Sequence, residues 1–232
     1  MDKINSTEFK EITKETLKDS VADTLRNAIL RRTLEPGQRM PESQIASKLG
    51  VSRAPVRDAL AVLLQEGLVE RDDRGVVVAE LTAADIVEIN SLRLALETQA
   101  VRLAITNATE NDFAQMNENI RRAAETVASG EAGELDLEFH ELLVRSAKHQ
   151  RLLICWLTLK SQIRWLLVRM DLDDVDYPEH SSVAHREFLE LLRTGDETKA
   201  VEMLESHLHN THRMVSERYG ESLRSVEDEL PV

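Results

Sequence analysis

Apolar residues in the first third of the chain recur with helical spacing in two short segments. The first segment covers about residues 15–31 and ends before the turn sequence EPG at 35–37. The second begins at Glu42 or Ser43 and ends at Gly50, a residue type that is common just past a helix C-terminus. We therefore expect one longer helix followed by a short one.

A third helix and a hairpin are expected next. Ser52 is a good N-terminal cap, and one apolar helical face runs from there to Gly67. Beyond it, the β-rich segments 68–71 and 76–79 are separated by the turn-forming residues 72–75. Three helices and a hairpin, with a glycine-containing turn between the second and third helices, are typical of a winged helix-turn-helix.

Only helical patterns follow the hairpin. Thr82 is a candidate N-cap for a long helix whose apolar stripe would consist of Ile86, Ile89, Leu92, Leu96 and Ala100. Further helices are expected at about 109–128, 132–147, 150–171, 180–194 and 197–219, with breaks at Gly130, His149, Tyr177-Pro178 and 194–196. The predicted fold class is mainly α: a winged helix-turn-helix domain at 1–80 and an antiparallel all-α bundle of about six helices at 81–232.

The composition agrees with a helical protein and indicates its cellular location. The 232 residues include 8 glycines and 5 prolines, and 42% are hydrophobic, which favours a folded chain rich in helix. No apolar run approaches the roughly 20 residues that cross a bilayer, and the N-terminal sequence has no apolar signal core, so we expect a cytoplasmic protein with no membrane partner. The single Cys155 cannot form an internal disulfide, and the apolar run 152–157 around it predicts a core position.

The charge is divided unevenly between the two parts. The chain carries 29 basic and 42 acidic residues, a formal net charge of -13, which taken alone argues against a nucleic-acid partner. Residues 1–80 contribute only -1 to this charge, and residues 81–232 contribute -12. Residues 48–57 hold three basic residues and no acidic one. The acidic excess therefore does not oppose DNA binding by the first part.

The start of the predicted third helix carries the residues expected to read DNA. In a winged helix-turn-helix this helix enters the major groove, and its first residues meet bases and phosphates. Here these residues are Ser52, Arg53, Ala54, Pro55 and Arg57. Two arginines alone are more often a solvated helix face, but their position in a helix-turn-helix favours contact with guanine and phosphate.

Residues 36–78 resemble the DNA-binding domain of GntR-family transcriptional regulators. The resemblance lies in PG before the second helix, LGVSRxPVRxAL across the turn, EGLV at the helix end and RGVVV in the wing. Two positions differ from the usual pattern: Ala54, where threonine is common, and Ser43, where some members have arginine. These differences leave the operator sequence open.

The resemblance implies how the domain meets DNA. It places Arg53 and Arg57 against operator DNA and brings the wing-tip residues Arg74 and Gly75 to the minor groove. Because one winged helix reads only a few base pairs, we expect a homodimer on a palindromic double-stranded operator.

Four polar residues are expected to point into the bundle from three helices. Asp136 and His140 are four residues apart and share a helix face, while His185 and His207 lie on the apolar faces of two later helices. A carboxylate and three neutral imidazoles suit a divalent transition metal such as Zn, Ni or Mn. A lone buried histidine is more often a hydrogen-bonded core residue, and Asp136 with His140 could be a simple ion pair, but four converging residues favour a metal site.

The remaining histidines are weaker candidates. His209 falls on an outer face, and His212 could lie beside the site. His149 and His180 lie at helix junctions, where contact with solvent is expected.

The second part resembles the FCD ligand-binding domain of the FadR-type branch of GntR regulators. The resemblance lies in RxxxE within SLRLALET, DxxxH within DLEFH, the later HREFL, and ESHLHNTH in the last helix. In metal-binding members an Asp and three His hold a divalent ion whose open positions receive a carboxylate of the effector, and this pattern falls on the same four residues. Arg93 is either a second clamp on the acid or an ordinary ion-pair partner of Glu97.

These features together predict a regulator rather than an enzyme. The leading hypothesis is a dimeric DNA-binding repressor whose operator affinity changes when a small organic acid binds at the metal. The alternatives are a DNA-tethered metalloenzyme, for which no motif supplies a further catalytic base, and a constitutive DNA-binding protein with a purely structural metal.

Overall fold

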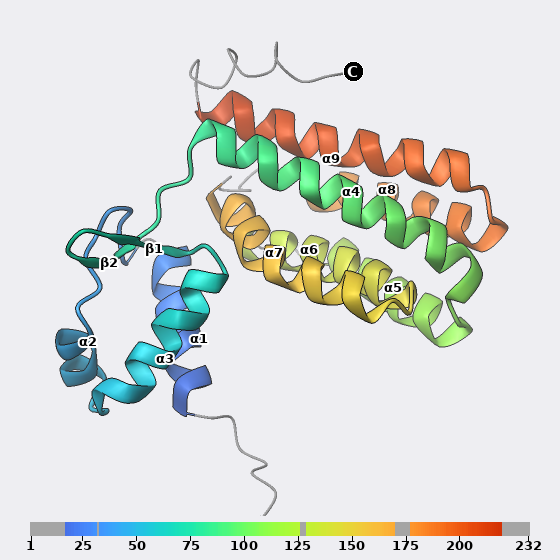
Figure 1. Cartoon of the computed structure of the whole chain (residues 1–232). Helices are drawn as coiled ribbons and strands as arrows, with labels where there is room; N and C mark the ends of the chain where they lie inside the picture. The colour runs from blue at the N-terminus through green and yellow to red at the C-terminus, as the bar shows by residue number, and fades with distance from the viewer. Residues whose placement is uncertain (1–16, 32, 126–128, 170–176, 220–232) are drawn as a thin grey trace, which may run out of the picture.

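The computed structural model describes residues 17–31, 33–125, 129–169 and 177–219, and over these residues the chain folds into two packed units (Figure 1). The first, called the head below, spans residues 17–79. It consists of α1 (Leu17–Leu30), α2 (Glu42–Leu49), α3 (Arg53–Gln65), β1 (Val69–Asp72) and β2 (Gly75–Val78). The predicted winged helix-turn-helix is thus confirmed.

The second unit, called the bundle below, spans residues 83–219. It consists of α4 (Ala83–Asn107), α5 (Glu110–Glu125), α6 (Ser129–Ser146), α7 (Gln150–Arg169), α8 (Tyr177–Thr194) and α9 (Glu197–Tyr219). Within the described part of the bundle there is no strand, as the sequence predicts. Helix α4 packs against α6, α7, α8 and α9, so it is the central element of the bundle.

The helix-turn-helix is held by a left-handed residue between α2 and α3. Gly50 has φ 66°, and its N–H donates to the carbonyl of Ala46, which ends α2 and turns the chain into α3. Ser52 stands at the N-cap of α3 with extended backbone, as expected, but its side chain makes no capping hydrogen bond. The predicted capping interaction of Ser52 is therefore wrong, and its hydroxyl remains exposed at the start of the helix.

The wing is a short antiparallel hairpin. Its register pairs Val69 with Val78 and Asp72 with Gly75, leaving a two-residue turn at Asp73 and Arg74. The carboxylate of Asp72 accepts a hydrogen bond from the backbone N–H of Arg74 at 2.8 Å. This bond, together with the neighbouring Arg39, lowers the pKa of Asp72 and fixes the shape of the wing tip.

The bundle begins as the sequence predicts, but two of the predicted helix breaks lie inside helices. Thr82 caps α4 as predicted, in a capping box with Asp85. Gly130 and Tyr177-Pro178 were expected to break helices, but Gly130 lies inside the first turn of α6, and Tyr177 begins α8. Proline is tolerated in the first turn of a helix because the N–H it lacks would have no partner there.

Helix α4 is rotated relative to the predicted apolar stripe. Leu92, expected in the core, is 56% exposed, whereas Arg93 and Glu97 are buried, at 1% and 0% exposed. Only Ile86, Ile89 and Ala100 of the predicted stripe are fully buried. The middle of α4 therefore places the ion pair of Arg93 and Glu97 inside the bundle, where it contacts polar residues of α6.

Helix α7 likewise exposes part of a run that was expected to be core. Cys155 is exposed, and Ile154 is 54% exposed, so the core prediction for Cys155 is wrong. The apolar run 152–157 is longer than one helix face, and only Leu152 and Trp156 within it are buried. In the described residues, no helix has a stretch apolar and long enough to span a lipid bilayer.

Candidate functional site

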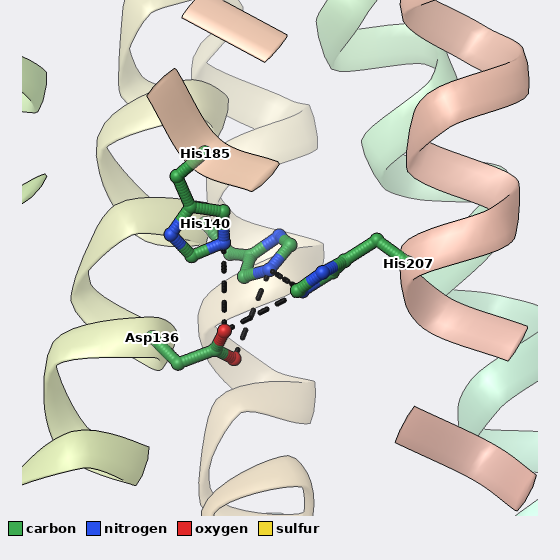
Figure 2. Close-up of side chains that lie close together, drawn as sticks. All are labelled: Asp136, His140, His185 and His207. Carbon is green, nitrogen blue, oxygen red and sulfur yellow. Dashed lines mark hydrogen bonds and ion pairs between the residues drawn. The ribbon is translucent and has the colours of Figure 1, made fainter. Parts of the chain in front are cut away.

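Four side chains from three helices meet in the centre of the bundle (Figure 2). Asp136 and His140 come from successive turns of α6, His185 from α8 and His207 from α9. One ligand atom from each lies within 4.8 Å of those of the other three. Asp136, His140 and His185 are buried, and His207 is partly exposed. The structure thus brings together the four residues that the sequence placed on inward faces.

The distances among the donor atoms suit a small coordination site. Nε2 of His140 and Nε2 of His207 are 3.2 Å apart, and Oδ1 of Asp136 lies 3.4 Å from Nε2 of His207 and 3.5 Å from Nε2 of His185. In a tetrahedral site with metal–ligand bonds of about 2.0–2.1 Å, two ligand atoms are separated by about 3.3–3.4 Å. The spacing therefore matches that of ligands sharing one metal ion.

Two buried atoms of the cluster lack hydrogen-bond partners among the described residues. Oδ2 of Asp136 and Nε2 of His185 are shielded from solvent and accept or donate no hydrogen bond there. A buried carboxylate oxygen and a buried imidazole nitrogen without partners cost free energy, whereas both are strong ligands for a divalent ion. The residues present therefore fit the metal that the sequence predicts.

The protonation states of the cluster favour metal binding. Burial lowers the pKa of His140 and holds the pKa of His185 well below its usual value, so both imidazoles are neutral near pH 7. Burial would raise the pKa of Asp136, but the facing histidines outweigh it and hold that pKa well below its ordinary value. Neutral imidazoles and an ionised carboxylate are the forms that bind metals.

Glu97 of α4 contacts the side of the His140 ring that faces away from the cluster. Its Oε2 lies 2.6 Å from Nδ1 of His140, and its Oε1 accepts hydrogen bonds from Nε of Arg93 at 2.9 Å and Nε1 of Trp156 at 3.0 Å. Burial opposes ionisation of Glu97, but the interactions of its carboxylate with His140 and with the charged Arg93 lower its pKa to about 2. An ionised carboxylate only accepts, so Nδ1 of His140 is the donor and Nε2 keeps its lone pair.

Sequence reasoning missed this role of Glu97, and it missed Trp156 entirely. It treated Glu97 only as the i, i+4 partner of Arg93. That ion pair is present, and Nη2 of Arg93 also lies 3.8 Å from Oδ2 of Asp136. The available signal was the position of Glu97, three and seven residues before the apolar Ala100 and Ala104, which places it on the buried face of α4.

A small cavity adjoins the three histidines. Its volume is about 10 Å³, and its walls include Phe139, Phe188 and Met203. The ring of Phe139 stacks on His185 with centroids 3.8 Å apart. Ser181 of α8, which the sequence did not single out, donates to Oδ1 of Asp136 at 3.1 Å. A space of about 10 Å³ holds roughly one water molecule, so the site is narrow in this arrangement.

The other histidines lie outside the cluster or have side chains that the structure does not describe. His149 is the residue before α7, and its Nδ1 accepts the N–H of Leu152 at 3.1 Å, so it caps that helix. His209 is exposed, as expected. The side chains of His180 and His212 lie outside the described residues.

The predicted DNA-reading residues are exposed on the surface of the head, except Pro55, which is half-buried. Ser52, Arg53, Ala54 and Arg57 are exposed at the start of α3, and Arg74 and Gly75 are exposed at the wing tip. In the described part of the chain, neither Arg53 nor Arg57 takes part in an ion pair. By contrast, Arg26 and Arg39 of the same domain are paired with carboxylates. Both α3 arginines are therefore available to an external anion.

An exposed, arginine-bearing helix in a winged helix-turn-helix, joined to an all-helical bundle with a cluster of one Asp and three His at its centre, is typical of a transcription regulator. The chain belongs to the GntR family. Residues 17–78 match the model of bacterial regulatory proteins of the gntR family, and residues 88–210 match that of the FCD domain.

Named relatives are transcriptional regulators. The gluconate operon transcriptional repressor of Bacillus subtilis strain 168 is 27% identical over 206 residues, 85% of this chain and 84% of the relative. The transcriptional repressor RspR of Escherichia coli K12 is 27% identical over 215 residues, 88% of each chain. The regulator YdhC of Bacillus subtilis is 36% identical over 133 residues, 55% of this chain; that match spans only 59% of YdhC.

Solved structures show the same architecture. A GntR transcriptional regulator from Rhodococcus sp. RHA1 superposes with a TM-score of 0.70 at 25% identity, over 85% of this chain and 96% of that one. McbR of Escherichia coli superposes with a TM-score of 0.71 at 22% identity, over 89% of this chain and 100% of that one, which shows the fold alone.

Proposed function

We propose that the protein is a transcriptional repressor whose operator binding is controlled by a small carboxylic acid, bound at a divalent metal in the bundle. The observation that carries this proposal is the convergence of Asp136, His140, His185 and His207 with donor atoms within 4.8 Å of one another. The repressor relatives and the exposed arginines of α3 support the DNA-binding part.

The metal would be held by the carboxylate of Asp136 and one nitrogen each of His140, His185 and His207. Zn, Ni and Mn all accept such ligands. When bound, the ion supplies a Lewis-acidic centre with positions open to an oxygen ligand. Glu97 keeps Nδ1 of His140 protonated, and Ser181 orients Asp136, so these side chains prepare the site for the ion.

The buried charges favour an anionic effector. One buried cation, Arg93, faces two ionised carboxylates, Glu97 and Asp136, so the centre carries one excess negative charge when its imidazoles are neutral. A divalent ion reverses the sign to one excess positive charge, which a single carboxylate neutralises. Because Arg93 lies 3.8 Å from Asp136, it stands beside the metal ligands and is our candidate for a second contact with the acid.

The small volume of the cavity explains how binding would alter the protein. A cavity of about 10 Å³ does not admit an organic acid, so α8 or α9 must move outward when the acid enters. A ligand shifts a conformational equilibrium only when it binds one arrangement better than the other. The open bundle is the arrangement that the acid selects.

In the head, Arg53 and Arg57 would contact bases and phosphates in the major groove, with Ser52 and Ala54 beside them. Arg74 and Gly75 would approach the minor groove from the wing. We further propose a homodimer on a palindromic site, because one α3 reads only a few base pairs. Light scattering of the full chain, free and with DNA, tests this: a monomer bound to a half-site would contradict it.

A gel-shift experiment tests the regulatory proposal. The probe is a duplex selected by the full chain from random sequence, and a panel of small carboxylic acids is added with and without chelator. We expect at least one acid to change the DNA affinity, and chelator to abolish the change. Elemental analysis of the purified protein tests the metal: His185→Ala with His207→Ala should remove stoichiometric metal, and His209→Ala should retain it.

The small volume of the cavity also favours a second candidate, a metal of purely structural function. In that case the metal-binding results would be the same, but no acid would change the affinity for the selected duplex. Chelation would then lower the melting temperature of the bundle without any acid dependence.

A further inference from the structure

Helix α7 carries the two tryptophans of the chain on opposite faces, and each is buried in a different unit. Trp156 is 0% exposed and belongs to the core of the bundle, whereas Trp165 is 1% exposed and belongs to the core of the head. They are nine residues apart, which on an α-helix is about two and a half turns and about 14 Å. One rigid element thus enters both cores.

Trp165 is a buried member of the core of the head, although it belongs to a helix of the bundle. In the described residues, every other buried member of that core comes from residues 21–79. Neighbouring residues of α7, Ile163 and Leu166, pack in the bundle core instead. Figure 1 shows the C-terminal end of α7 turned toward the head, and α7 is in contact with α1 there.

A second contact joins α7 to the end of the recognition helix. Gln162, one turn before Trp165 on the same face, covers Gly67, where the chain leaves α3 with φ 69°. A Cβ atom at Gly67 would collide with the amide nitrogen Nε2 of Gln162. Beside these contacts a groove of about 610 Å³ separates the units, so the junction is concentrated at the end of α7 and at Leu81, which packs against both cores.

At its other end, α7 is tied to the candidate metal centre. Nε1 of Trp156 donates to Oε1 of Glu97 at 3.0 Å, and Oε2 of the same carboxylate lies 2.6 Å from Nδ1 of His140. Two hydrogen bonds therefore separate α7 from a metal ligand. A change in the position of His140 must either move Trp156 or break a buried hydrogen bond, which is unfavourable.

We propose that α7 transmits the state of the metal centre to the head. Trp156 is displaced when the metal centre changes, and Trp165 passes this displacement to the core of the head. This inference rests on the metal site proposed above. Its physical basis is that a helix is stiff along its axis, so a displacement at Trp156 reaches Trp165 and Gln162 and shifts the core that positions α3.

Hydrogen exchange followed by mass spectrometry tests the proposal on the full chain. Metal-stripped protein is compared with protein containing Zn²⁺. In the unaltered chain, Zn²⁺ should slow exchange in α6, α8 and α9, and also in α1 and α3, by about tenfold or more in the head. In Trp165→Ala the bundle should respond as before, while the response of α1 and α3 is lost.

Two further variants separate transmission from simple loss of packing. Trp156→Phe keeps an aromatic ring but removes the N–H, so it should weaken the response of the head while the head itself remains as protected as in the unaltered chain. Ile154→Ala changes an exposed position of the same helix and should leave both responses intact.

The outcomes are distinct. Protection of the bundle with no change in the head of the unaltered chain overturns transmission through α7 and leaves the metal site standing. An equal response of the head in Trp165→Ala overturns it as well. Absence of any Zn²⁺-dependent protection in α6, α8 and α9 overturns the metal site itself, and the transmission inference with it.

Discussion

The carboxylate of Glu97 approaches Nδ1 of His140 to 2.6 Å and decides which nitrogen of that ring faces the centre of the bundle. Because Glu97 is ionised and can only accept, the proton of a neutral His140 resides on Nδ1. Nε2 of His140 then carries a lone pair and faces Asp136 and His207. Glu97 is thus a positioning residue for the candidate metal ligands.

We predict that Glu97→Gln weakens metal binding by about 10- to 100-fold without removing it. A neutral amide makes His140 a poorer ligand and can present the wrong hydrogen-bonding group to Nδ1. Competition with a chromophoric chelator measures the affinity for Zn²⁺. Glu88→Gln, on an exposed position of the same helix, is the control. An affinity equal to that of the unaltered protein would remove Glu97 from this role.

Acid should destabilise the metal-free protein in the range where histidine titrates. Burial keeps the pKa of His140 and of His185 below the usual 6.5, so below about pH 6.5 the unfolded chain binds protons that the folded chain does not. The lowered pKa of Asp136 adds a further loss only below about pH 4.

Thermal unfolding in the presence of chelator checks this pH dependence. The melting temperature should fall between about pH 7.5 and about pH 5.5, and the fall should persist in His209→Ala, which alters an exposed histidine. A melting temperature that is constant or higher at the lower pH would show that the buried imidazoles are not held neutral.

Arg53→Ala should weaken binding to the selected duplex by roughly 1–3 kcal/mol if Arg53 makes a bidentate contact with guanine. Fluorescence anisotropy at fixed ionic strength measures the loss, because phosphate contacts elsewhere depend on salt. Arg121→Ala is a matched control, since Arg121 is an exposed arginine of the bundle that pairs with Glu118 and Glu125. Equal affinities of Arg53→Ala and the control would place Arg53 outside the reading surface.

Gly50→Ala should lower the free energy of unfolding of the protein by about 1 kcal/mol. At φ 66° an alanine is strained, although its Cβ would meet no atom within 4 Å, so the cost is conformational rather than steric. Urea denaturation gives the difference, with Ser47→Ala at an exposed position of α2 as reference. No change relative to the reference would mean that the turn between α2 and α3 relaxes around the new side chain.

Much of the fold follows from local sequence. The glycine after α2, the apolar spacing of α1 and α3 and the hairpin residues specify the head through short-range preferences. The four site residues were also identifiable, because helical periodicity alone places Asp136 and His140 on one face and His185 and His207 on inward faces. In these cases a residue and its immediate neighbours contain the needed information.

Other features depend on contacts between distant segments. Local periodicity favoured Leu92 as core, but the packing of α4 against α6 and α7 buries Arg93 and Glu97 instead, because His140 and Trp156 are hydrogen-bond partners of Glu97, and Glu97 is the ion-pair partner of Arg93. The exposure of Cys155 also depends on distant segments, because the helices packed against α7 decide which side of its apolar run is buried.

The sequence by itself thus determined the order of the helices and the wing, and it identified the candidate metal ligands and the residues predicted to read DNA, which are exposed on the head. Only the tertiary structure decided that Glu97 stands behind His140 and that Trp165 of the bundle completes the core of the head. The physical reason is that helix and turn preferences act over a few residues, whereas burial is decided by segments that meet after 40 or more residues of intervening chain.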